Sequence, residues 1–265
     1  MTPQTLLAHL DSGAPWPPQP DAQRPTDLAQ AYRDALAVRA LRVARGEKPV
    51  GFKIGFTNRT IWQRYRVFAP IWGTVWNTTL HFCEGRGAMP LRALCQPRLE
   101  PEIVFGIRAT PPLEPSIEQL FDCVEWLAPG FEIVQSHCAD WVFTTAQAVA
   151  DSGLHGRLLV GPKTPVRDLA GSGEALDTIL AASRVRLLRG GAPIDEGVGG
   201  DVLDGPLHAL RHFVLELQQC PGAPQLREGD VVTTGTWTDA WPLSAGEVWR
   251  AEFDTPLRSI EIALP

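Results

Sequence analysis

Hydrophobic and polar residues alternate strictly in the segment VGFKIGF, residues 50–56. Its apolar side chains share one face of an extended chain, while Lys53 falls on the other face between Gly51 and Gly55. Alternation with a period of two is typical of a β-strand that is buried on one side. The segment is therefore predicted to be a strand, with Lys53 on the side away from its apolar residues.

Short apolar runs recur along most of the chain and predict further strands. They lie at residues 71–76, 91–96, 102–107, 131–135, 157–161, 183–188, 230–234, 247–253 and 258–263. Helical patterns are few, in the segments 27–45, 116–126, 143–150 and 205–219, and Thr57 is a candidate N-cap for a short helix through Tyr65. Strands that follow one another in runs, without helices alternating regularly between them, favour an α+β fold on a curved or barrel-like sheet over a doubly wound sheet.

The beginning of the chain differs from the rest in its helical and proline-rich character. Residues 14–25, APWPPQPDAQRP, predict an irregular connector, and Thr26 and Gly46 frame the helix that follows it. We therefore expect residues 1–70 to form an N-terminal helical and linker region that contains the first strand. Residues 71–265 are expected to form the main β-rich domain, and the two parts together one compact unit.

Composition and charge narrow the classes of function. The chain of 265 residues has a formal net charge of −6, which argues against nucleic acid as a partner because phosphate binding needs a basic surface. No apolar segment is long enough to span a membrane, and the first residues lack the pattern of a secretory signal. Five cysteines without a CxxC pair predict reduced thiols rather than disulfides or a zinc site. These features predict a cytoplasmic protein.

Two carboxylates stand at the beginning of an apolar run in RLEPEIVFG, residues 98–106. On a strand, Glu100 and Glu102 project from the same face, where they repel each other unless a cation or a proton lies between them. Pro101 limits backbone pairing there and suggests the edge of a sheet. Taken alone, however, the motif favours a solvent-facing pair at a strand end.

A third carboxylate changes that balance. Glu132 enters a second apolar strand directly after a Pro-Gly turn in PGFEIVQSHCADW, residues 129–141. Three carboxylates from two strands would offer oxygen ligands to a hard divalent ion such as Mg²⁺ or Mn²⁺ and leave open coordination positions. His137 in the same segment is expected to be structural, because a lone histidine near a strand end is more often structural than a ligand.

Lys53 and the TGT segment are further candidates for contact with a ligand. Lys53 stands between Gly51 and Gly55, whose missing side chains leave space beside it, so that it could act as an acid, a base or an electrostatic anchor. The alternative is a lysine that protects an edge strand from aggregation. Gly235 and Thr236 offer close backbone approach and a hydroxyl in what otherwise reads as a loop.

Four segments, in their order and spacing, resemble a known family. They are GFKIGFT, LEPEIVF, FEIVQSHCADW and DVVTTGTWTDAWPLSAGE. Over roughly residues 26 to 264 the chain resembles the fumarylacetoacetate hydrolase superfamily, and within it the 2-oxopent-4-enoate hydratases and 4-oxalocrotonate decarboxylases of meta-cleavage pathways, which serve aromatic catabolism. The resemblance implies a mixed β-sandwich roll with peripheral helices, assembled as a homo-oligomer. It also implies Mg²⁺ or Mn²⁺ at Glu100, Glu102 and Glu132, a functional Lys53, and substrate contacts at Gly55, Gly235 and Thr236.

Two segments depart from the pattern of the hydratases. IWGTVWNTTL has Asn77 and Thr78 where an acidic residue is usual. DSGLHG keeps Asp151 of a D-N-A-S-like segment, loses its Asn and Ser, and adds His155. Asp151 and His155 are the further catalytic candidates, with the expected task of orienting a water molecule.

The leading hypothesis is a divalent-metal-dependent hydratase, a carbon–oxygen lyase. It would act on a 2-hydroxydienoate or 2-keto-enoate such as 2-hydroxypenta-2,4-dienoate through a metal-stabilised enolate. A 4-oxalocrotonate-type 2-keto acid decarboxylase is the near alternative, because the same enolate would be its electron sink. An acylpyruvate C–C hydrolase and a catalytically silent structural homologue are the more distant ones. The expected partners are a small 2-keto acid, further copies of the chain and a paralogous pathway enzyme, with neither nucleic acid nor a membrane.

Overall fold

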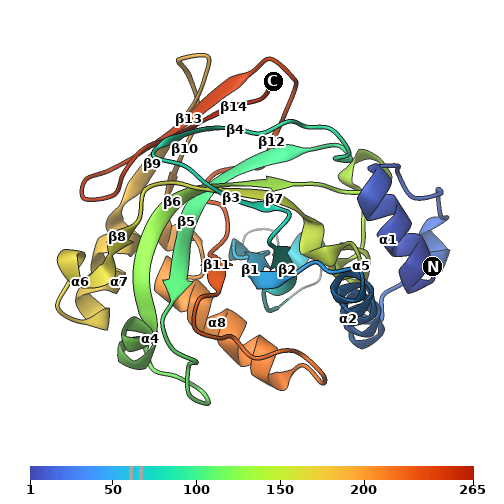
Figure 1. Cartoon of the computed structure of the whole chain (residues 1–265), viewed down its shortest axis with the longest axis horizontal. Helices are drawn as coiled ribbons and strands as arrows, with labels where there is room; N and C mark the ends of the chain where they lie inside the picture. Colours follow the sequence, from blue (N-terminus) through green and yellow to red (C-terminus); the bar gives the residue numbers. More distant parts are fainter. Residues whose placement is uncertain (60–61, 66–67) are drawn as a thin grey trace.

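A rolled β-sheet forms the centre of the molecule. The computed structural model describes residues 1–59, 62–65 and 68–265, and within them the larger sheet has nine strands. They are β1 (Pro49–Gly55), β2 (Ile71–Trp76), β3 (Leu80–Phe82), β5 (Arg98–Ile107), β6 (Val124–Val134), β7 (His155–Val160), β8 (Thr164–Pro165), β11 (Val231–Thr233) and β12 (Trp241–Pro242). The main order is β2-β1-β11-β5-β6-β7-β3, with β12 paired to β5 and β8 to β6. Because β3 follows β2 through a short turn yet pairs with β7, the sheet curls round on itself (Figure 1).

A smaller sheet packs across one side of this roll. Within the described ranges it has five strands in the order β10-β9-β13-β14-β4. They are β4 (Arg86–Ala88), β9 (Arg184–Arg189), β10 (Ala192–Val198), β13 (Val248–Phe253) and β14 (Ile260–Ala263). Figure 1 shows this sheet above the long, curved strands β5 and β6, and contacts between β14 and β6 join the two sheets.

Helices surround the roll and cover its outer face. The α-helices are α1 (Pro3–Ser12), α2 (Leu28–Ala44), α3 (Trp62–Tyr65), α4 (Ile117–Cys123), α5 (Thr145–Ala150), α6 (Val166–Leu169), α7 (Gly173–Ala182) and α8 (Pro206–Gln219). Short 3-10 helices are η1 (Asp21–Gln23), η3 (Ala139–Trp141), η4 (Ser152–Leu154) and η5 (Gly199–Asp201). One group, α1, α2 and α5, packs together on one side, and α4, α7 and α8 form a second group elsewhere on the roll (Figure 1). The rolled sheet with peripheral helices confirms the predicted α+β fold.

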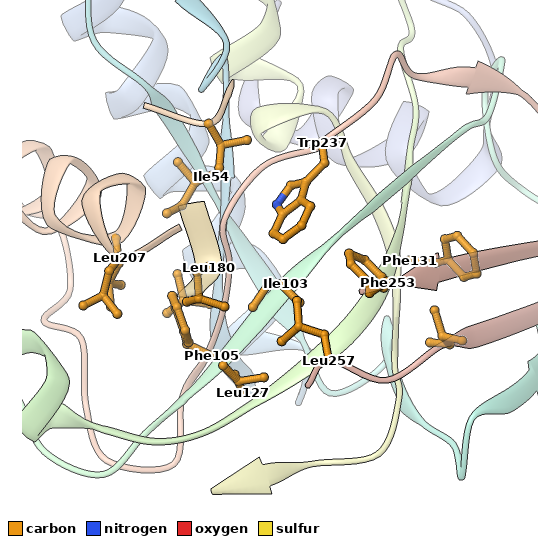
Figure 2. Close-up of a cluster of buried hydrophobic side chains, with 14 of the residues drawn as sticks. Ile54, Ile103, Phe105, Leu127, Phe131, Leu180, Leu207, Trp237, Phe253 and Leu257 are labelled. Carbon is orange, nitrogen blue, oxygen red and sulfur yellow. The ribbon is translucent and has the colours of Figure 1, made fainter. Parts of the chain in front are cut away.

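Alternation along the long strands sends one set of side chains to the outside of the roll. Ile103 and Phe105 of β5 join Leu127 of β6, Leu180 of α7 and Leu207 of α8 in the largest hydrophobic core (Figure 2). This core also includes residues of the smaller sheet. Burial of these apolar side chains holds the helices and the smaller sheet against the outer face of the roll.

The other set of side chains points into the roll. Val104 of β5, Ala128 of β6 and Leu158 of β7 belong to a smaller apolar cluster drawn from strands of the rolled sheet. Two and four residues before Val104, on the same face of β5, stand Glu102 and Glu100. The interior of the roll is therefore apolar at one end and lined by carboxylates at the other.

The first helix, α1, is not predicted by the hydrophobic pattern. Thr2 caps its N-terminus through its side chain, Pro3 occupies the first turn, and Gly13 with φ 68° ends it. These are ordinary start and stop signals, and they could have revealed the helix. Leu6 shares a core cluster with Phe143, so the N-terminal helices pack against a much later part of the chain.

Residues 91–96, predicted to be a strand, form turns instead, and that prediction is wrong. Ala93 (φ 60°) and Gln96 (φ 49°) have left-handed backbone conformations that interrupt an extended strand. The side-chain amide of Gln96 donates to the carbonyl oxygens of Ser136 and Cys138. The segment therefore braces the chain beyond the end of β6. The other predicted strands each overlap an observed strand, and the helix predicted over 116–126 ends at Cys123, where β6 begins.

Pro101 lies in an interior strand, not at the outer edge of the sheet as its sequence suggests. On one side β5 pairs with β6 along its whole length. On the other side β12 pairs up to Leu99 and β11 from Val104 onward, so that Pro101 falls in the gap between them. A residue without an N–H fits this interruption of the ladder.

All five cysteines carry free thiols, which confirms the prediction of a chain without disulfides. Among the described residues, no helix has both the length and the apolar character that a membrane crossing requires.

Candidate metal centre and active site

The pairing of β5 with β6 brings the three predicted carboxylates together. Glu100 lies directly opposite Glu132, and Glu102 lies opposite Gly130, which has no side chain to fill the space. One ligand oxygen from each carboxylate lies within 4.8 Å of the others. In the described part of the chain, this is the one cluster of acidic, histidine or cysteine side chains arranged so that it could hold an ion.

Glu102 is fully buried and is held by the backbone that follows β11. Its Oε2 accepts hydrogen bonds from the N–H of Thr234 (2.8 Å) and of Gly235 (2.5 Å). Among the described residues, its Oε1 has no hydrogen-bond partner. A buried carboxylate oxygen without a donor carries a large desolvation cost, which a bound cation would offset.

Glu132 has the same half-satisfied arrangement. Its Oε1 lies 2.8 Å from Nδ1 of His155. Its Oε2 forms an ion pair with Nζ of Lys53 at 3.4 Å, but within the described ranges it makes no hydrogen bond. Two buried carboxylates thus each leave one oxygen available to a ligand.

The charges in this cluster are not balanced by the protein. Burial raises the pKa of Glu100 to about 7, although Lys53 opposes the shift. Burial, and then the charges of Glu132 and Glu100, raise the pKa of Glu102 well above its usual value. The donor set consists of hard carboxylate oxygens with excess negative charge, and it therefore fits a hard divalent cation.

Lys53 lies on β1 at the inner end of the site and is 2% exposed. Burial alone would lower the pKa of its ammonium, but the three neighbouring carboxylates raise it above the ordinary value. The space predicted on both sides of Lys53 exists on one side only. A Cβ on Gly51 would collide with the backbone of Val231, so Gly51 permits the close pairing of β1 with β11, whereas Gly55 lines a cavity beside the lysine.

This cavity has a volume of about 200 Å³ and reaches Glu100, one of the three carboxylates. Lys53 and Glu100 line it, together with Gly55, Gly235 and Thr236, which are the residues predicted to contact a substrate. The structure therefore brings the predicted lysine, one predicted ligand and the predicted substrate segment to the same space.

Arg98 and Trp141 also line the cavity and were not predicted as site residues. The guanidinium of Arg98 lies 4.4 Å from the ring centre of Trp141, a cation–π contact. The sequence contains a signal for Arg98, because it precedes Glu100 by two residues and so shares the inner face of β5.

Asp151 and His155 do not line the cavity in the part of the chain that the structure describes. Both oxygens of Asp151 meet His137, at 2.6 Å to its Nδ1 and 2.8 Å to its backbone N. His155 lies behind Glu132, with its Nε2 2.9 Å from Oγ1 of Thr79, and burial lowers its pKa. These contacts indicate support of neighbouring groups, and the predicted task of orienting water stays a prediction.

Asn77 and Thr78, the departure from the hydratase pattern, lie in the turn between β2 and β3. Asn77 Oδ1 accepts a hydrogen bond from the N–H of Lys48, and the hydroxyl of Thr78 donates to Glu47. Both side chains therefore hold the turn against the segment that precedes β1.

Comparison with known proteins tests the family resemblance. The chain is 30% identical to a 2-hydroxyhexa-2,4-dienoate hydratase of Comamonas testosteroni, over 92% of this chain and 89% of that protein. It is also 30% identical to a 4-oxalocrotonate decarboxylase of a Pseudomonas species, over 85% of this chain and 84% of that protein. The chain belongs to the hydratase and decarboxylase branch of the fumarylacetoacetate hydrolase superfamily. A 2-keto-4-pentenoate hydratase of Paraburkholderia xenovorans (strain LB400) is 28% identical to this chain, over 95% of this chain and 89% of that protein. No family model matches this chain.

Solved structures of fumarylacetoacetate hydrolase superfamily proteins share the fold of this branch member. A 4-oxalocrotonate decarboxylase from Pseudomonas putida G7 matches with a TM-score of 0.86 at 20% identity, over 100% of this chain and 99% of that one. A fumarylpyruvate hydrolase from Pseudomonas aeruginosa matches with a TM-score of 0.55 at 14% identity, over 82% of this chain and 90% of that one. The predicted family and fold are both confirmed.

Proposed function

We propose that this protein is a divalent-metal-dependent hydratase that adds water to a 2-hydroxydienoate such as 2-hydroxypenta-2,4-dienoate. The observation that carries this proposal is the cluster of Glu100, Glu102, Glu132 and Lys53, of which Glu100 and Lys53 line one cavity. Relatives with 28 to 30% identity over most of the chain are named as hydratases of such acids, which supports the reaction class.

Glu100, Glu102 and Glu132 are proposed to hold Mg²⁺ or Mn²⁺. When bound there, the cation would supply Lewis acidity toward the oxygens of a 2-keto acid. The proposal is supported by the unsatisfied oxygens of Glu102 and Glu132. It is also supported by structural neighbours, since a decarboxylase was solved with magnesium and adipate and a fumarylpyruvate hydrolase with Mn²⁺ and pyruvate.

Lys53 is proposed to hold and move a proton at its Nζ. In the overall reaction the dienol loses its hydroxyl proton and gains one on carbon, which gives an unsaturated ketone, and water then adds across the remaining double bond. Lys53 is the cationic donor beside the carboxylates, so its ammonium can stabilise negative charge on the substrate oxygen and exchange a proton with it.

The cavity walls set the size and character of the proposed substrate. Ile71, Trp141 and Phe143 form apolar walls around a space of about 200 Å³, smaller than the pockets that hold drug-sized ligands. Gly235 and Thr236 line the same space. These walls suit a short unsaturated chain whose oxygens are turned toward Glu100 and Lys53.

A 4-oxalocrotonate-type decarboxylase is the second candidate function. The observation in its favour is the decarboxylase relative at 30% identity, as similar to this chain as the hydratase relatives are. The carboxylates and Lys53 would serve both reactions, because each passes through negative charge on the 2-oxygen.

We further propose that the protein is cytoplasmic and that it assembles with other subunits. A reducing cytoplasm is supported by the five free thiols, which form no disulfide in the structure. Assembly as a homo-oligomer, and with a paralogous enzyme of aromatic catabolism, rests on the family likeness. Analytical ultracentrifugation of the purified chain, alone and with such a paralogue, would test both.

Chelation tests the proposed reaction directly. Purified protein is expected to consume 2-hydroxypenta-2,4-dienoate with loss of its dienol absorbance, to stop in EDTA, and to recover with Mg²⁺ or Mn²⁺. Turnover that continues unchanged in chelator would refute the metal assignment. Product analysis by ¹H NMR, with 4-oxalocrotonate as a parallel substrate, separates a hydrated keto acid from loss of CO₂ and so decides between the two candidates.

A further inference from the structure

A β-bulge turns His155 toward the metal centre. In the pairing of β6 with β7, Glu132 faces Leu158 and Ile133 faces Arg157, but Val134 faces His155, so that Gly156 is skipped. Strict alternation would place His155 on the outer face, and the extra residue returns it to the inner face. A Cβ on Gly156 would lie 2.5 Å from the carbonyl oxygen of Ile133, so the bulge needs glycine there.

The redirected imidazole sits in a chain of hydrogen bonds that ends on Glu132. The N–H of Trp76 lies 3.1 Å from Oγ1 of Thr79, which lies 2.9 Å from Nε2 of His155. Nδ1 of His155 then lies 2.8 Å from Oε1 of Glu132. Trp76 is the last residue of β2, and Thr79 lies in the turn after it. The series of hydrogen bonds therefore connects the backbone of one strand to a carboxylate on another.

The partner atoms determine which groups in this series of hydrogen bonds donate and which accept. A carboxylate oxygen accepts, so Nδ1 of His155 donates to Glu132. The hydroxyl of Thr79 accepts from the N–H of Trp76, and its one proton can go to Nε2 of His155 at 2.9 Å or to the carbonyl oxygen of Trp76 at 3.2 Å; Nε2 accepts it when Nδ1 carries the proton of a neutral ring. With both ring nitrogens engaged, the ring cannot rotate without losing two hydrogen bonds.

We propose that His155 is a positioning residue that fixes the carboxylate of Glu132 for metal binding. It occupies Oε1 and thereby leaves Oε2 beside Nζ of Lys53, while Glu132 as a whole stays in the cluster with Glu100 and Glu102. This inference rests on the proposed metal-dependent function. It assigns His155 a role through Glu132, in place of direct contact with water or substrate.

Partners behind a metal ligand commonly contribute about 10- to 100-fold to metal affinity. His155 is 4% exposed and Glu132 is fully buried, so bulk water does not compete for this hydrogen bond in the folded protein. The expected loss therefore lies within this range.

Mn²⁺ binding to metal-stripped protein tests the role without requiring any activity. Isothermal titration calorimetry is expected to show a dissociation constant at least about 10-fold weaker in His155→Gln than in the wild type. His155→Asn is the matched variant, because its side-chain amide N–H lies near the place of Nδ1 and can still donate to Glu132. Its affinity is expected to stay within about threefold of the wild type, a small part of the 10- to 100-fold range.

Circular dichroism of the metal-free variants establishes that they are folded. Equal Mn²⁺ affinity of folded His155→Gln and the wild type would overturn the positioning role while leaving the metal assignment intact. If the wild type itself bound no Mn²⁺, the proposed function would fall first. Should His155→Gln not fold, Thr79→Val removes the anchor at the other end of the ring, and unchanged affinity in that variant would overturn the inference.

Discussion

Two buried histidine–carboxylate pairs use the same chemical groups in different surroundings. Between the end of β6 and α5, His137 and Asp151 form a closed pair. Both Asp151 oxygens meet His137, and Nε2 of His137 faces the carbonyl oxygen of His9 on α1 at 3.1 Å. Trp16 stacks on the His137 ring, with 6.1 Å between the two ring centroids. All the side-chain polar atoms of this pair have protein partners, and the pair ties the N-terminal helix to the rolled sheet.

The second pair, His155 and Glu132, is open at one end. Oε1 of Glu132 is hydrogen bonded to His155, but in the described part of the chain Oε2 lacks a hydrogen bond, and the residue clusters with two further carboxylates. Burial of titratable groups therefore does not by itself identify a site, since both pairs are buried. The mark is an unsatisfied polar atom that faces groups of like charge.

The open and the closed pair should respond differently to mutation. Substitutions in the open region should change chemistry more than folding, and substitutions in the closed region should change folding more than chemistry. Each of the following variants tests that distinction.

Lys53→Met is expected to have the largest effect. Methionine keeps much of the side-chain length but removes the proton at Nζ, so kcat on 2-hydroxypenta-2,4-dienoate should fall by about 10²- to 10⁴-fold. Steady-state kinetics at saturating Mg²⁺ measure this, with circular dichroism as the check of folding. Lys48→Met, at an exposed lysine, is the control. A rate near that of the wild type would show that Lys53 is not an acid–base group.

Glu102→Gln should weaken metal binding with little effect on folding. Loss of a ligand charge should lower Mn²⁺ affinity by more than the roughly 10- to 100-fold contributed by a group behind a ligand. The metal-free protein should be at least as stable as the wild type, because one of three repelling carboxylates is removed and the amide oxygen still accepts from Thr234 and Gly235.

Calorimetry with Mn²⁺ and urea unfolding of the metal-free protein measure the two quantities for Glu102→Gln. Glu125→Gln, at an exposed position of β6, is the control. Unchanged affinity for Mn²⁺ would exclude Glu102 from the metal centre.

His137→Asn should have the opposite effect. The amide N–H of asparagine can still donate to Asp151, but the contact of Nε2 to the His9 carbonyl and the stacking on Trp16 are lost, so the free energy of unfolding should fall by about 2 kcal/mol. Below the melting temperature, kcat should change by less than about tenfold, or 1.4 kcal/mol. Urea unfolding and kinetics test this, with His81→Asn on β3 as the control. A loss of kcat as large as that of Lys53→Met, without loss of stability, would remove the distinction between the two pairs.

Thr2→Ala should have the smallest effect, confined to the closed region. It removes the N-cap of α1, whose side chain accepts from the N–H of Thr5 at 3.2 Å, and should cost the helix about 0.5–1 kcal/mol. Hydrogen exchange of α1 amides should become faster, while Thr2→Ser should retain the protection of the wild type. Unchanged exchange in Thr2→Ala would mean that α1 is held by its packing alone.

Local periodicity accounts for much of the candidate site. A period of two placed Glu100 and Glu102 on one face of β5 and separated Lys53 from Phe52 and Ile54 on β1. Those assignments depend only on neighbours within one strand, and for this reason they could be made from the residues. The same period of two also places Arg98 on the face of β5 that carries Glu100 and Glu102.

Other features depend on partners that are distant in the sequence. Gly51 is required by the backbone of Val231, and the bulge at Gly156 by the backbone of Ile133. The left-handed conformations of Ala93 and Gln96 likewise disagree with an apolar run that reads as a strand. Such contacts leave no periodic trace in the segment itself.

The residues alone indicate which side chains share a strand face, where the carboxylates and the lysine stand on their strands and, through the motifs, the family. They do so because strand geometry is local and repeats every two residues. Three relations arise only when the chain folds: Glu132 lies opposite Glu100, His155 turns toward Glu132, and Asp151 contacts His137 and does not line the cavity. Strand register, a single bulge and the docking of α1 set these relations, and each depends on packing between segments that the chain brings together only when it folds.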